Sequence, residues 1–384
     1  MKRLFACTLA LCAALSLQLQ AQRSELRLEK GWRFTRQDQA SFSTPDYNDS
    51  KWSRVTVPHD WAIYGPFSFE NDKQHLAIAQ DGQKEAMEHA GRTGGLPFVG
   101  AGWYRRSLDI PQDLGDRRVF LRFDGAMSHA RVYVNGKEVG YWPYGYNTFA
   151  FDVTPYVRPG ASNTLAVRLE NKHESSRWYP GAGLYRNVHL TITSPTYIPL
   201  WGTRIQTPSV SADQAYVSVE TKVAGLSHLA GRPLRIETKI LSPEGKVVAE
   251  RSESFSSKGA DSIYRTGFDI SAPKLWDINQ PNLYKYAVTL SDGSRVIDRD
   301  TTTFGIRSIE LKAGEGFFLN GRKLKFQGAC LHHDLGPLGA AVNEAAMRRQ
   351  IRQMQDMGVN AIRTSHNMPA PEFIRLCDEM GMPV

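Results

Sequence analysis

Apolar and polar residues alternate with a period of two through the first half of the chain, which predicts strands that bury one face. The alternation is clear over 119–123 and again over 165–169. Residues 132–134 alternate into Asn135-Gly136, a dipeptide typical of a two-residue hairpin turn. Turn residues recur at short intervals through 25–194. We therefore expect a jelly-roll or similar β-sandwich, an architecture often used to bind carbohydrate.

A second stretch of alternating residues runs from about 198 to 307. Residues 216–223 alternate, and Pro243-Glu244-Gly245 predicts a turn. Residues 286–290 then lead into the turn pair Asp292-Gly293. The length and the strand spacing favour an immunoglobulin-like sandwich. The stretch has no Cys–Trp–Cys pattern, so an antibody-type domain is not implied.

The hydrophobic period changes in the last part of the chain, where short apolar segments alternate with amphipathic ones. Residues 325–332 and 359–365 predict two short apolar strands, and Val359, Ala361 and Ile362 are typical of a strand buried on both faces. Residues 343–357 and 371–380 carry apolar side chains at helical spacing, and 382–384 begin a third strand. A parallel barrel closes with about eight strand–helix units. We therefore expect the truncated start of a (β/α)8 barrel, and a chain that is the N-terminal part of a larger enzyme.

The ends of both helices are marked in the sequence. Asn343 can cap the first helix, and Gly358 can end it in a left-handed conformation. Pro371 suits the first turn of the second helix, and Gly381 ends it.

The first residues have the pattern of a secretion signal. Lys2 and Arg3 precede an apolar run over 4–17, and Ala21 offers a small residue for cleavage before Gln22. A membrane anchor is the alternative, but the run is shorter than the roughly 20 residues that a spanning helix needs. We therefore expect an exported protein, periplasmic or secreted, with no membrane attachment once the signal is removed.

Charge and cysteine content argue against other classes of protein. The net charge of +8 falls to +6 once Lys2 and Arg3 are removed, and the basic residues are interleaved with acidic ones. A nucleic-acid or membrane surface would need clustered cations. Only Cys330 and Cys377 then remain, too few for a disulfide framework, so we expect two buried free thiols. Residues 77–95, rich in glycine and polar side chains, predict a long surface loop.

Two groups of polar residues, 328–334 and 360–367, stand at the carboxyl ends of the predicted barrel strands. Barrel enzymes place their active sites there. His332 and His366 end adjacent strands, so their rings could converge on one pocket and hydrogen-bond substrate hydroxyls. A role in holding loops in place is an equally supported alternative. A zinc site ranks lower, because it needs three or four ligands and no spacing supplies them.

Carboxylates are scarce near these strand ends. Asp334 is the only acid there, and a loop or capping role suits it. Glu372, Asp378 and Glu379 fall in the second helix, where we expect them to face solvent. The residues up to Val384 therefore offer no carboxylate pair for acid–base chemistry.

Five blocks of sequence point to one family when taken together. Four are Val57-Pro58-His59-Asp60-Trp61, Gly102-Trp103-Tyr104-Arg105-Arg106, Gly183-Leu184-Tyr185-Arg186-Asn187-Val188 and Phe304-Gly305-Ile306-Arg307. The fifth and most specific is Asn360-Ala361-Ile362-Arg363-Thr364-Ser365-His366. With these blocks the chain resembles glycoside hydrolase family 2, the family of β-galactosidases, β-glucuronidases and β-mannosidases, over nearly all of its mature length.

The resemblance implies three domains after a signal peptide at 1–21. They are a jelly-roll, sugar-binding-like domain at 22–196, an immunoglobulin-like β-sandwich at 197–308 and the truncated start of a catalytic (β/α)8 barrel at 309–384. It also implies a retaining mechanism, in which two carboxylates about 5 to 5.5 Å apart act as acid/base and nucleophile. In the family both are glutamates on later barrel strands. No catalytic residue is therefore expected before Val384, and this part alone is expected to be inactive.

The resemblance also assigns substrate-binding residues. His332 and His366 match histidines that line the family's sugar pocket, and Arg363 matches an arginine near the catalytic carboxylates. Asn367 follows His366 and is a further candidate for substrate binding, although it departs from the tyrosine that many classical β-galactosidases have there. The loop 176–181 lies in the region of the first-domain residues that reach the sugar, but its composition differs.

The function implied is that of a β-galactosidase that hydrolyses terminal β-linked sugars, most similar to Bacteroidetes-type enzymes. β-Glucuronidase and β-mannosidase are alternatives within the family, and a non-catalytic carbohydrate-binding or scaffold protein is an alternative outside it. The expected partner is a carbohydrate, with neither nucleic acid nor a membrane. No cofactor is expected on these residues. A divalent metal in the longer enzyme and a homo-oligomeric state are left open.

Overall fold

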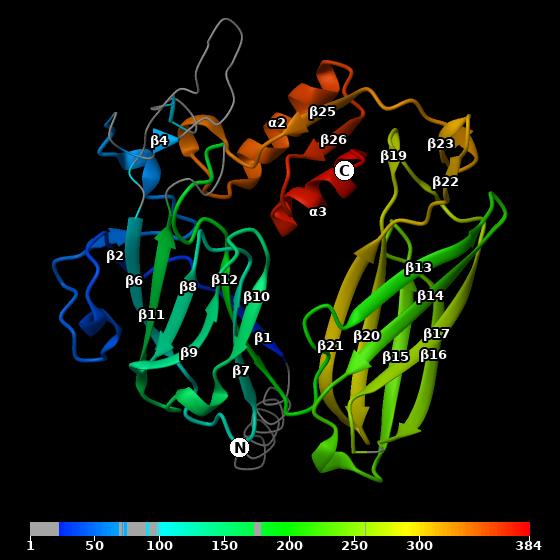
Figure 1. Cartoon of the computed structure of the whole chain (residues 1–384). Helices are drawn as coiled ribbons and strands as arrows, with labels where there is room; N and C mark the ends of the chain where they lie inside the picture. The colour runs from blue at the N-terminus through cyan, green and yellow to red at the C-terminus, as the bar shows by residue number, and fades with distance from the viewer. Residues whose placement is uncertain are drawn as a thin grey trace, which may run out of the picture.

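The computed structural model contains two β-sandwiches side by side and a smaller β/α portion that lies over one end of them (Figure 1). The predicted signal at 1–21 and most of the expected surface loop at 77–95 lie outside the described residues. Within the described part, no helix is long and apolar enough to cross a membrane. The residues described are 23–68, 71, 73–74, 90–91, 98, 100–172, 178–257 and 259–384.

The first sandwich is formed by two antiparallel sheets. One has the order β1 (Ser24–Arg27), β12 (Val188–Thr193), β7 (Arg118–Phe123), β10 (Phe149–Asp152). The other has the order β3 (Ser53–Val55), β2 (Trp32–Thr35), β6 (Gly100–Asp109), β11 (Ser162–Asn171), β8 (Ala130–Val134), β9 (Lys137–Trp142). Short elements complete this part of the chain: β4 (Lys73–Gln74), β5 (Ala90–Gly91), η1 (Ala40–Ser43), η2 (Ala62–Tyr64) and η3 (Thr154–Tyr156).

Alternation builds the core of this sandwich as the sequence predicts. Leu121, Val132 and Val167 point between the sheets and are fully buried, while their polar neighbours face outward. The β8–β9 hairpin turns at Asn135-Gly136, both with positive φ, as a two-residue turn of this type requires.

The second sandwich carries seven long strands in two sheets, which confirms the immunoglobulin-like prediction. Its core gathers around Val219, Ile236 and Tyr286. The three-stranded sheet is β13 (Thr203–Val210), β14 (Gln214–Val223), β17 (Ser262–Ser271), and the four-stranded sheet is β16 (Val247–Ser256), β15 (Pro233–Leu241), β20 (Tyr284–Asp292), β21 (Arg295–Phe304). Smaller elements are η4 (Ser227–Leu229), β18 (Trp276–Asp277) and β19 (Gln280–Pro281).

The last part begins with a small antiparallel sheet and continues as two strand–helix units. The sheet is β22 (Ile309–Lys312), β23 (Gly316–Leu319), β24 (Arg322–Lys323). The units are β25 (Gly328–Leu331) with η5 (Gly336–Leu338) and α2 (Glu344–Asp356), then β26 (Ala361–Thr364) with α3 (Pro371–Met380). Strands β25 and β26 pair in parallel, with Leu331 opposite Thr364. This is the start of a barrel, as expected.

The helix ends fall where the sequence marks them. The Asn343 side chain accepts a hydrogen bond from the Ala346 amide, which caps α2. Gly381 has a left-handed conformation immediately after α3. Pro371 is the first residue of α3, where its missing N–H costs no helical hydrogen bond.

Three expectations about side chains are wrong. The second parallel strand is not buried on both faces, because Arg363 of β26 is exposed. Glu372 does not face solvent: its side chain is buried and bonds the Asn187 side chain of the first sandwich. Cys330 is exposed, and only Cys377 is the buried free thiol that was predicted. On the other side, α3 contacts the second sandwich, where the Trp276 indole donates to the Asp378 carbonyl at 2.8 Å.

Candidate functional site

The two predicted histidines meet at the ends of the parallel strands. His332 directly follows β25, and His366 lies two residues after β26. Their ring centroids are 6.2 Å apart, and the ring planes are nearly perpendicular at 88°. Parallel pairing brings the carboxyl ends of β25 and β26 to one edge, so this convergence follows from the topology.

Trp178 of the first sandwich packs against both histidines. Its indole stacks on His332 at 5.4 Å with an interplanar angle of 20°. It meets the His366 ring edge-on at 5.5 Å. The indole N–H donates to the Tyr146 hydroxyl at 3.0 Å, which fixes the rotation of the indole. Sequence reasoning pointed to the 176–181 loop but did not identify this tryptophan as the contact.

Asn367 is connected to the histidine and tryptophan cluster through Tyr144, a second tyrosine of the first sandwich, whose ring contacts that of Tyr146. The Tyr144 hydroxyl donates to Asn367 Oδ1 at 2.8 Å. Asn367 Nδ2 and His332 Nδ1 are buried and have no hydrogen-bond partner among the described residues. Buried polar atoms are normally paired, so the hydrogen-bonding capacity of these two atoms is left unused by the described residues.

Arg363 lies apart from this cluster. Its guanidinium donates to the Ser365 hydroxyl at 3.3 Å and lies 3.9 Å from the Cys330 sulfur. The Ser365 hydroxyl and the Arg363 guanidinium lower the pKa of the Cys330 thiol. Of the four predicted binding residues, the structure therefore groups His332, His366 and Asn367. Arg363 lies on β26 and contacts Cys330 and Ser365 instead.

His333 was not predicted as a site residue and supports the site from behind. Its ring lies edge-on against Tyr146 and Tyr185, at 5.2 and 5.8 Å. Burial lowers the pKa of His333 to about 4, so the ring is neutral near pH 7. Its Nε2 is 2.9 Å from the Pro180 carbonyl, which can only accept, so the proton is on Nε2. His333 thereby fixes the Trp178-bearing loop to the barrel portion.

A buried carboxylate, Asp60, ties three segments together. Oδ1 accepts from the Ala62 and Ala182 amides, both at 3.0 Å. Oδ2 accepts from the Ala340 amide at 2.9 Å and from the Tyr179 hydroxyl at 2.5 Å. Burial raises the pKa of Asp60. The sequence block that contains Asp60 therefore holds the loop after His333 to the first sandwich.

Close approach to Asp60 explains one glycine of that loop. Gly339 has φ +63°, and a Cβ there would lie 2.5 Å from Asp60 Oδ2. Both the backbone conformation and the short distance require glycine.

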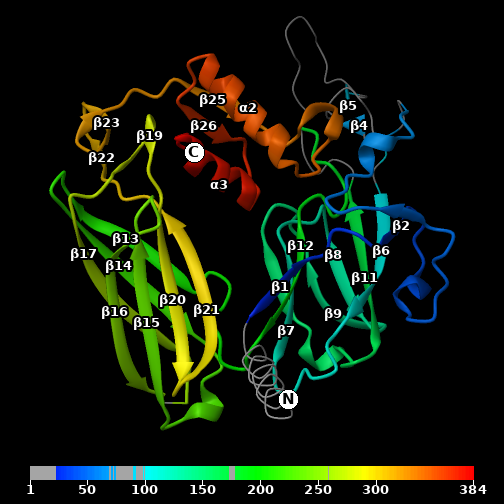
Figure 2. The ribbon, with the colours of Figure 1, turned by 180° about the vertical axis from the view of Figure 1, so that it is seen from behind.

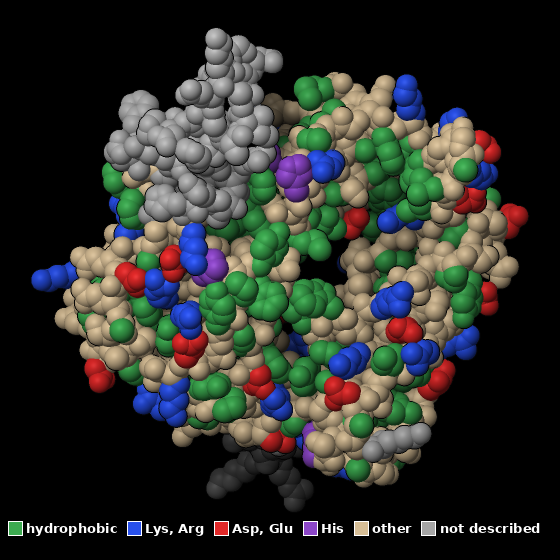
Figure 3. Space-filling model, viewed as in Figure 1, with side chains coloured by type: hydrophobic (Ala, Val, Ile, Leu, Met, Phe, Trp, Pro, Cys, Tyr) green, Lys and Arg blue, Asp and Glu red, His purple; other side chains and the backbone are tan. Residues whose placement is uncertain are grey.

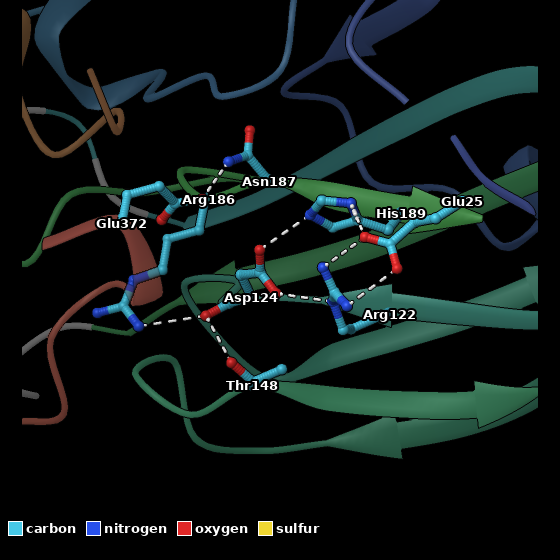
Figure 4. Close-up of polar contacts among 8 residues, drawn as sticks. All are labelled: Glu25, Arg122, Asp124, Thr148, Arg186, Asn187, His189 and Glu372. Atoms are coloured by element: carbon cyan, nitrogen blue, oxygen red, sulfur yellow. Dashed lines mark hydrogen bonds and ion pairs between the residues drawn. The ribbon is translucent and has the colours of Figure 1, made fainter. Parts of the chain in front are cut away.

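Arg186 holds the segment that follows Asn367. The buried guanidinium donates to the Met368 carbonyl at 2.8 Å and to the Pro369 carbonyl at 3.3 Å. It also donates to the carbonyls of Tyr146 and Asp124 in its own domain. The neighbouring Asn187 side chain donates to the Glu372 carboxylate, which accounts for the burial of that acid. Figure 4 shows the Arg186–Asp124 and Asn187–Glu372 contacts.

A ring of alternating charges lies beside Arg186, on the sheet of the first sandwich (Figure 4). His189 faces two carboxylates, Asp124 at 3.0 Å and Glu25 at 3.2 Å. Arg122 bonds the same two carboxylates from the other side. Hydrogen bonding by His189 lowers the pKa of Glu25 to about 2. Burial lowers the pKa of His189, but its bonds to Asp124 and Glu25 outweigh this and raise it.

The arrangement can bind a polyhydroxylated ligand through imidazole nitrogens, an amide and an indole face. Among the described residues, no group of three or more His, Cys, Asp or Glu could hold a metal ion. Charged side chains of both signs are interspersed over the face seen in Figure 3.

Comparison with known families matches three models over almost the whole described chain. They are "Glycosyl hydrolases family 2, sugar binding domain" at 26–194, "Glycosyl hydrolases family 2" at 198–307 and "Glycosyl hydrolases family 2, TIM barrel domain" at 309–384.

Curated relatives carry two kinds of name. A beta-galactosidase of Bacteroides ovatus is 38% identical over 375 residues, which are 97% of this chain and 42% of that protein. A beta-glucuronidase of Bacteroides fragilis is 32% identical over 96% of this chain and 50% of that protein. The chain thus spans about half or less of the length of these relatives.

Solved structures of similar fold are also longer. A glycosyl hydrolase family 2 member from Bacteroides cellulosilyticus superposes with a TM-score of 0.86 at 33% identity, over 93% of this chain and 45% of that one. A beta-glycosidase from Bacteroides vulgatus gives 0.83 at 31% identity, over 94% and 44%.

Proposed function

The chain belongs to glycosyl hydrolases family 2, and from this premise we propose that it is part of a glycosidase that removes terminal β-linked sugars, with β-galactosides as the substrate class. The observation that carries the proposal is the convergence of His332 and His366 against Trp178 at the ends of two parallel strands. The name of the Bacteroides ovatus relative supports the choice of galactosides.

The side chains of this site are suited to binding and orienting a sugar. His332 and His366 would hydrogen-bond hydroxyl groups of the ring, and Asn367 would add an amide donor through Nδ2. Trp178 holds both imidazoles in fixed orientations, which lowers the entropy lost on binding. Arg363 would act next to the carboxylates that the family resemblance expects after Val384.

Hydrolysis by a retaining mechanism needs a nucleophilic carboxylate and a second carboxyl group that alternates between acid and base. We assign neither role to a residue of this chain. A protein of these 384 residues should therefore release no product from an aryl β-galactoside above background, whereas a longer protein with a complete barrel should do so.

The test of the site uses that longer protein. Replacing His332 or His366 with Ala should lower kcat/KM about 10- to 1000-fold, because active-site hydrogen bonds that strengthen in the transition state are lost. His228→Ala is the matched control, because this histidine is exposed in the second sandwich and should leave kinetics unchanged. A His366→Ala variant that loses thermal stability but keeps wild-type kinetics would show that the histidine only holds its loop.

A β-glucuronidase activity is the second candidate, favoured by the name of the Bacteroides fragilis relative. Comparing kcat/KM for matched aryl β-galactoside, β-glucuronide and β-mannoside substrates separates the candidates. Absence of turnover on all three, together with binding of a free sugar, would favour the non-catalytic carbohydrate-binding alternative.

We also propose that the protein is exported. This part of the proposal rests on the N-terminal sequence pattern alone. A mature protein that begins at Gln22 in the periplasm or medium, detected by mass spectrometry, would support it. Recovery of uncleaved protein from the cytoplasm would contradict it.

A further inference from the structure

An open groove runs along the edge of the six-stranded sheet in the first sandwich. It is lined by residues from 31–37, 47–56 and 59–64. Strand β3 is the last strand of that sheet, with β2 beside it. In Figures 1 and 2, β2 lies on the side of the first sandwich that faces away from the second. The paired histidines of the candidate site are not among the lining residues.

Three arginines stand in register across the strands that form this edge. Arg33 of β2 is directly opposite Arg54 of β3 and Arg105 of β6. Arg105 is neutralised: it is buried, pairs with Asp49 at 3.0 Å and donates to several carbonyls of the 42–47 segment. Arg33 and Arg54 form no ion pair within the described chain. Arg33 also donates to the Trp52 carbonyl at 3.5 Å. Like charges directly opposite each other destabilise a sheet, and a bound anion would offset that repulsion.

Two further cations extend the positive charge along the groove. Arg36 and Lys51 line it and also form no ion pair within the part of the chain that the structure describes. No aspartate or glutamate is among the lining residues. Four cations without a carboxylate partner in the described residues make a site for an external anion.

The groove also offers an aromatic face. Tyr64 lines it and is 70% exposed, with its ring stacked on His59 at 5.9 Å and 19°. A rigid, exposed aromatic face beside polar groups suits the apolar face of a sugar ring. Guanidinium groups match carboxylate and sulfate oxygens with two parallel hydrogen bonds.

We propose that this groove binds an acidic glycan, a sugar chain that bears carboxylate or sulfate groups, with Arg33 and Arg54 pairing with its anionic groups and Tyr64 packing against a sugar ring. The proposal rests on the proposed carbohydrate substrate class for its choice of ligand. A nucleic acid fits less well, because its backbone carries a charge at every phosphate and calls for a longer cationic track than four side chains.

Binding can be measured directly on the chain without any turnover. Isothermal titration with a galacturonic acid hexamer and with a sulfated galactan oligosaccharide of the same length probes the two anionic groups separately. A neutral galactan hexamer is the ligand control. At least one acidic ligand should bind, and its affinity should fall as salt is added, because exposed charge pairs are screened. The neutral ligand should bind at least tenfold more weakly.

Arg33→Gln/Arg54→Gln should weaken acidic-glycan binding about tenfold or more, since two charge-assisted contacts are lost. Its melting temperature should stay equal or rise, because the like-charge repulsion is removed. The matched control is Lys137→Gln/Arg295→Gln, which removes the same net charge at exposed positions outside the groove and should bind as the wild type does. Arg33→Lys/Arg54→Lys should fall between, because lysine keeps the charge but not the paired hydrogen bonds.

Three results would overturn the proposal. Equal weakening by both double Gln variants would reduce it to an effect of net charge. Equal affinity for the neutral and the acidic hexamers would show that the arginines do not recognise the anionic groups of the ligand. Tighter binding of single-stranded DNA, lost in Arg33→Gln/Arg54→Gln, would make the groove a nucleic-acid site. None of these results bears on hydrolysis, so the proposed glycosidase activity would stand or fall separately.

Discussion

Replacing Asp60 with asparagine should release the loop that follows His333 while the first sandwich stays folded. The two carboxylate oxygens accept four hydrogen bonds, from three backbone amides and one hydroxyl. Asparagine keeps one oxygen and replaces the other with an NH2 group, which can only donate.

The orientation of the new amide decides which bonds survive. With NH2 at the Oδ1 position, the amides of Ala62 and Ala182 would both lose their acceptor. With NH2 at the Oδ2 position, only the Ala340 amide loses it, because the Tyr179 hydroxyl can rotate and accept. The second orientation should dominate. A buried amide left without an acceptor costs about 1–3 kcal/mol, and loss of the charged acceptor adds about 1 kcal/mol more.

The expected loss of unfolding free energy is therefore about 2–4 kcal/mol, measured by urea denaturation. Amide hydrogen exchange should accelerate at Ala340 and remain slow at Ala62 and Ala182. Asp60→Ala should cost more, because all three amides lose their acceptor. Asp116→Asn, at an exposed position of the same domain, should change nothing. An Asp60→Asn protein with wild-type stability and unchanged exchange at Ala340 would refute the assigned role.

Three further outcomes are expected. The charge ring of Glu25 and His189 should make the free energy of unfolding greatest between about pH 4.5 and 6.5. The contribution of Glu25 is lost as pH falls toward its lowered pKa of about 2. The contribution of His189 is lost as pH rises through its raised pKa. Denaturation across pH should show His189→Gln removing the alkaline decline, and an unchanged profile would contradict this. Arg186→Lys should speed proteolytic cleavage near Met368, because one ammonium group cannot serve several carbonyls, whereas exposed Arg204→Lys should not. Trp178→Ala should shift the NMR signals of His332 and His366 in this chain, and unchanged ring signals would show that the indole does not orient them.

Local signals in the sequence predicted the elements well. Pro371 and Gly381 bound the second helix at the residues where the structure begins and ends it, because each fixes or permits one backbone conformation. The Asn135-Gly136 turn fixed the register of its hairpin for the same reason. The convergence of His332 and His366 followed from parallel pairing, which needs only the order of the elements.

Contacts between distant segments were not predictable in this way. Glu372 looked like a solvent-facing helix residue because its partner, Asn187, lies 185 positions earlier in the chain. Trp178 likewise reaches the histidines only once the first sandwich has packed on the barrel portion. Hydrophobic periodicity indicates which face of an element is buried, but it does not identify the polar groups of the neighbouring element that this face contacts.

The connections made by Arg186 bear on how such proteins can be recombined into chimeras. The guanidinium reaches backbone carbonyls of Met368 and Pro369, which every amino-acid sequence supplies. The Asn187–Glu372 hydrogen bond joins two side chains, so a chimera must keep both the asparagine and the glutamate to retain it. A first sandwich grafted onto a foreign barrel would keep the arginine anchor without redesign, whereas the neighbouring asparagine would require a glutamate to be carried along with it.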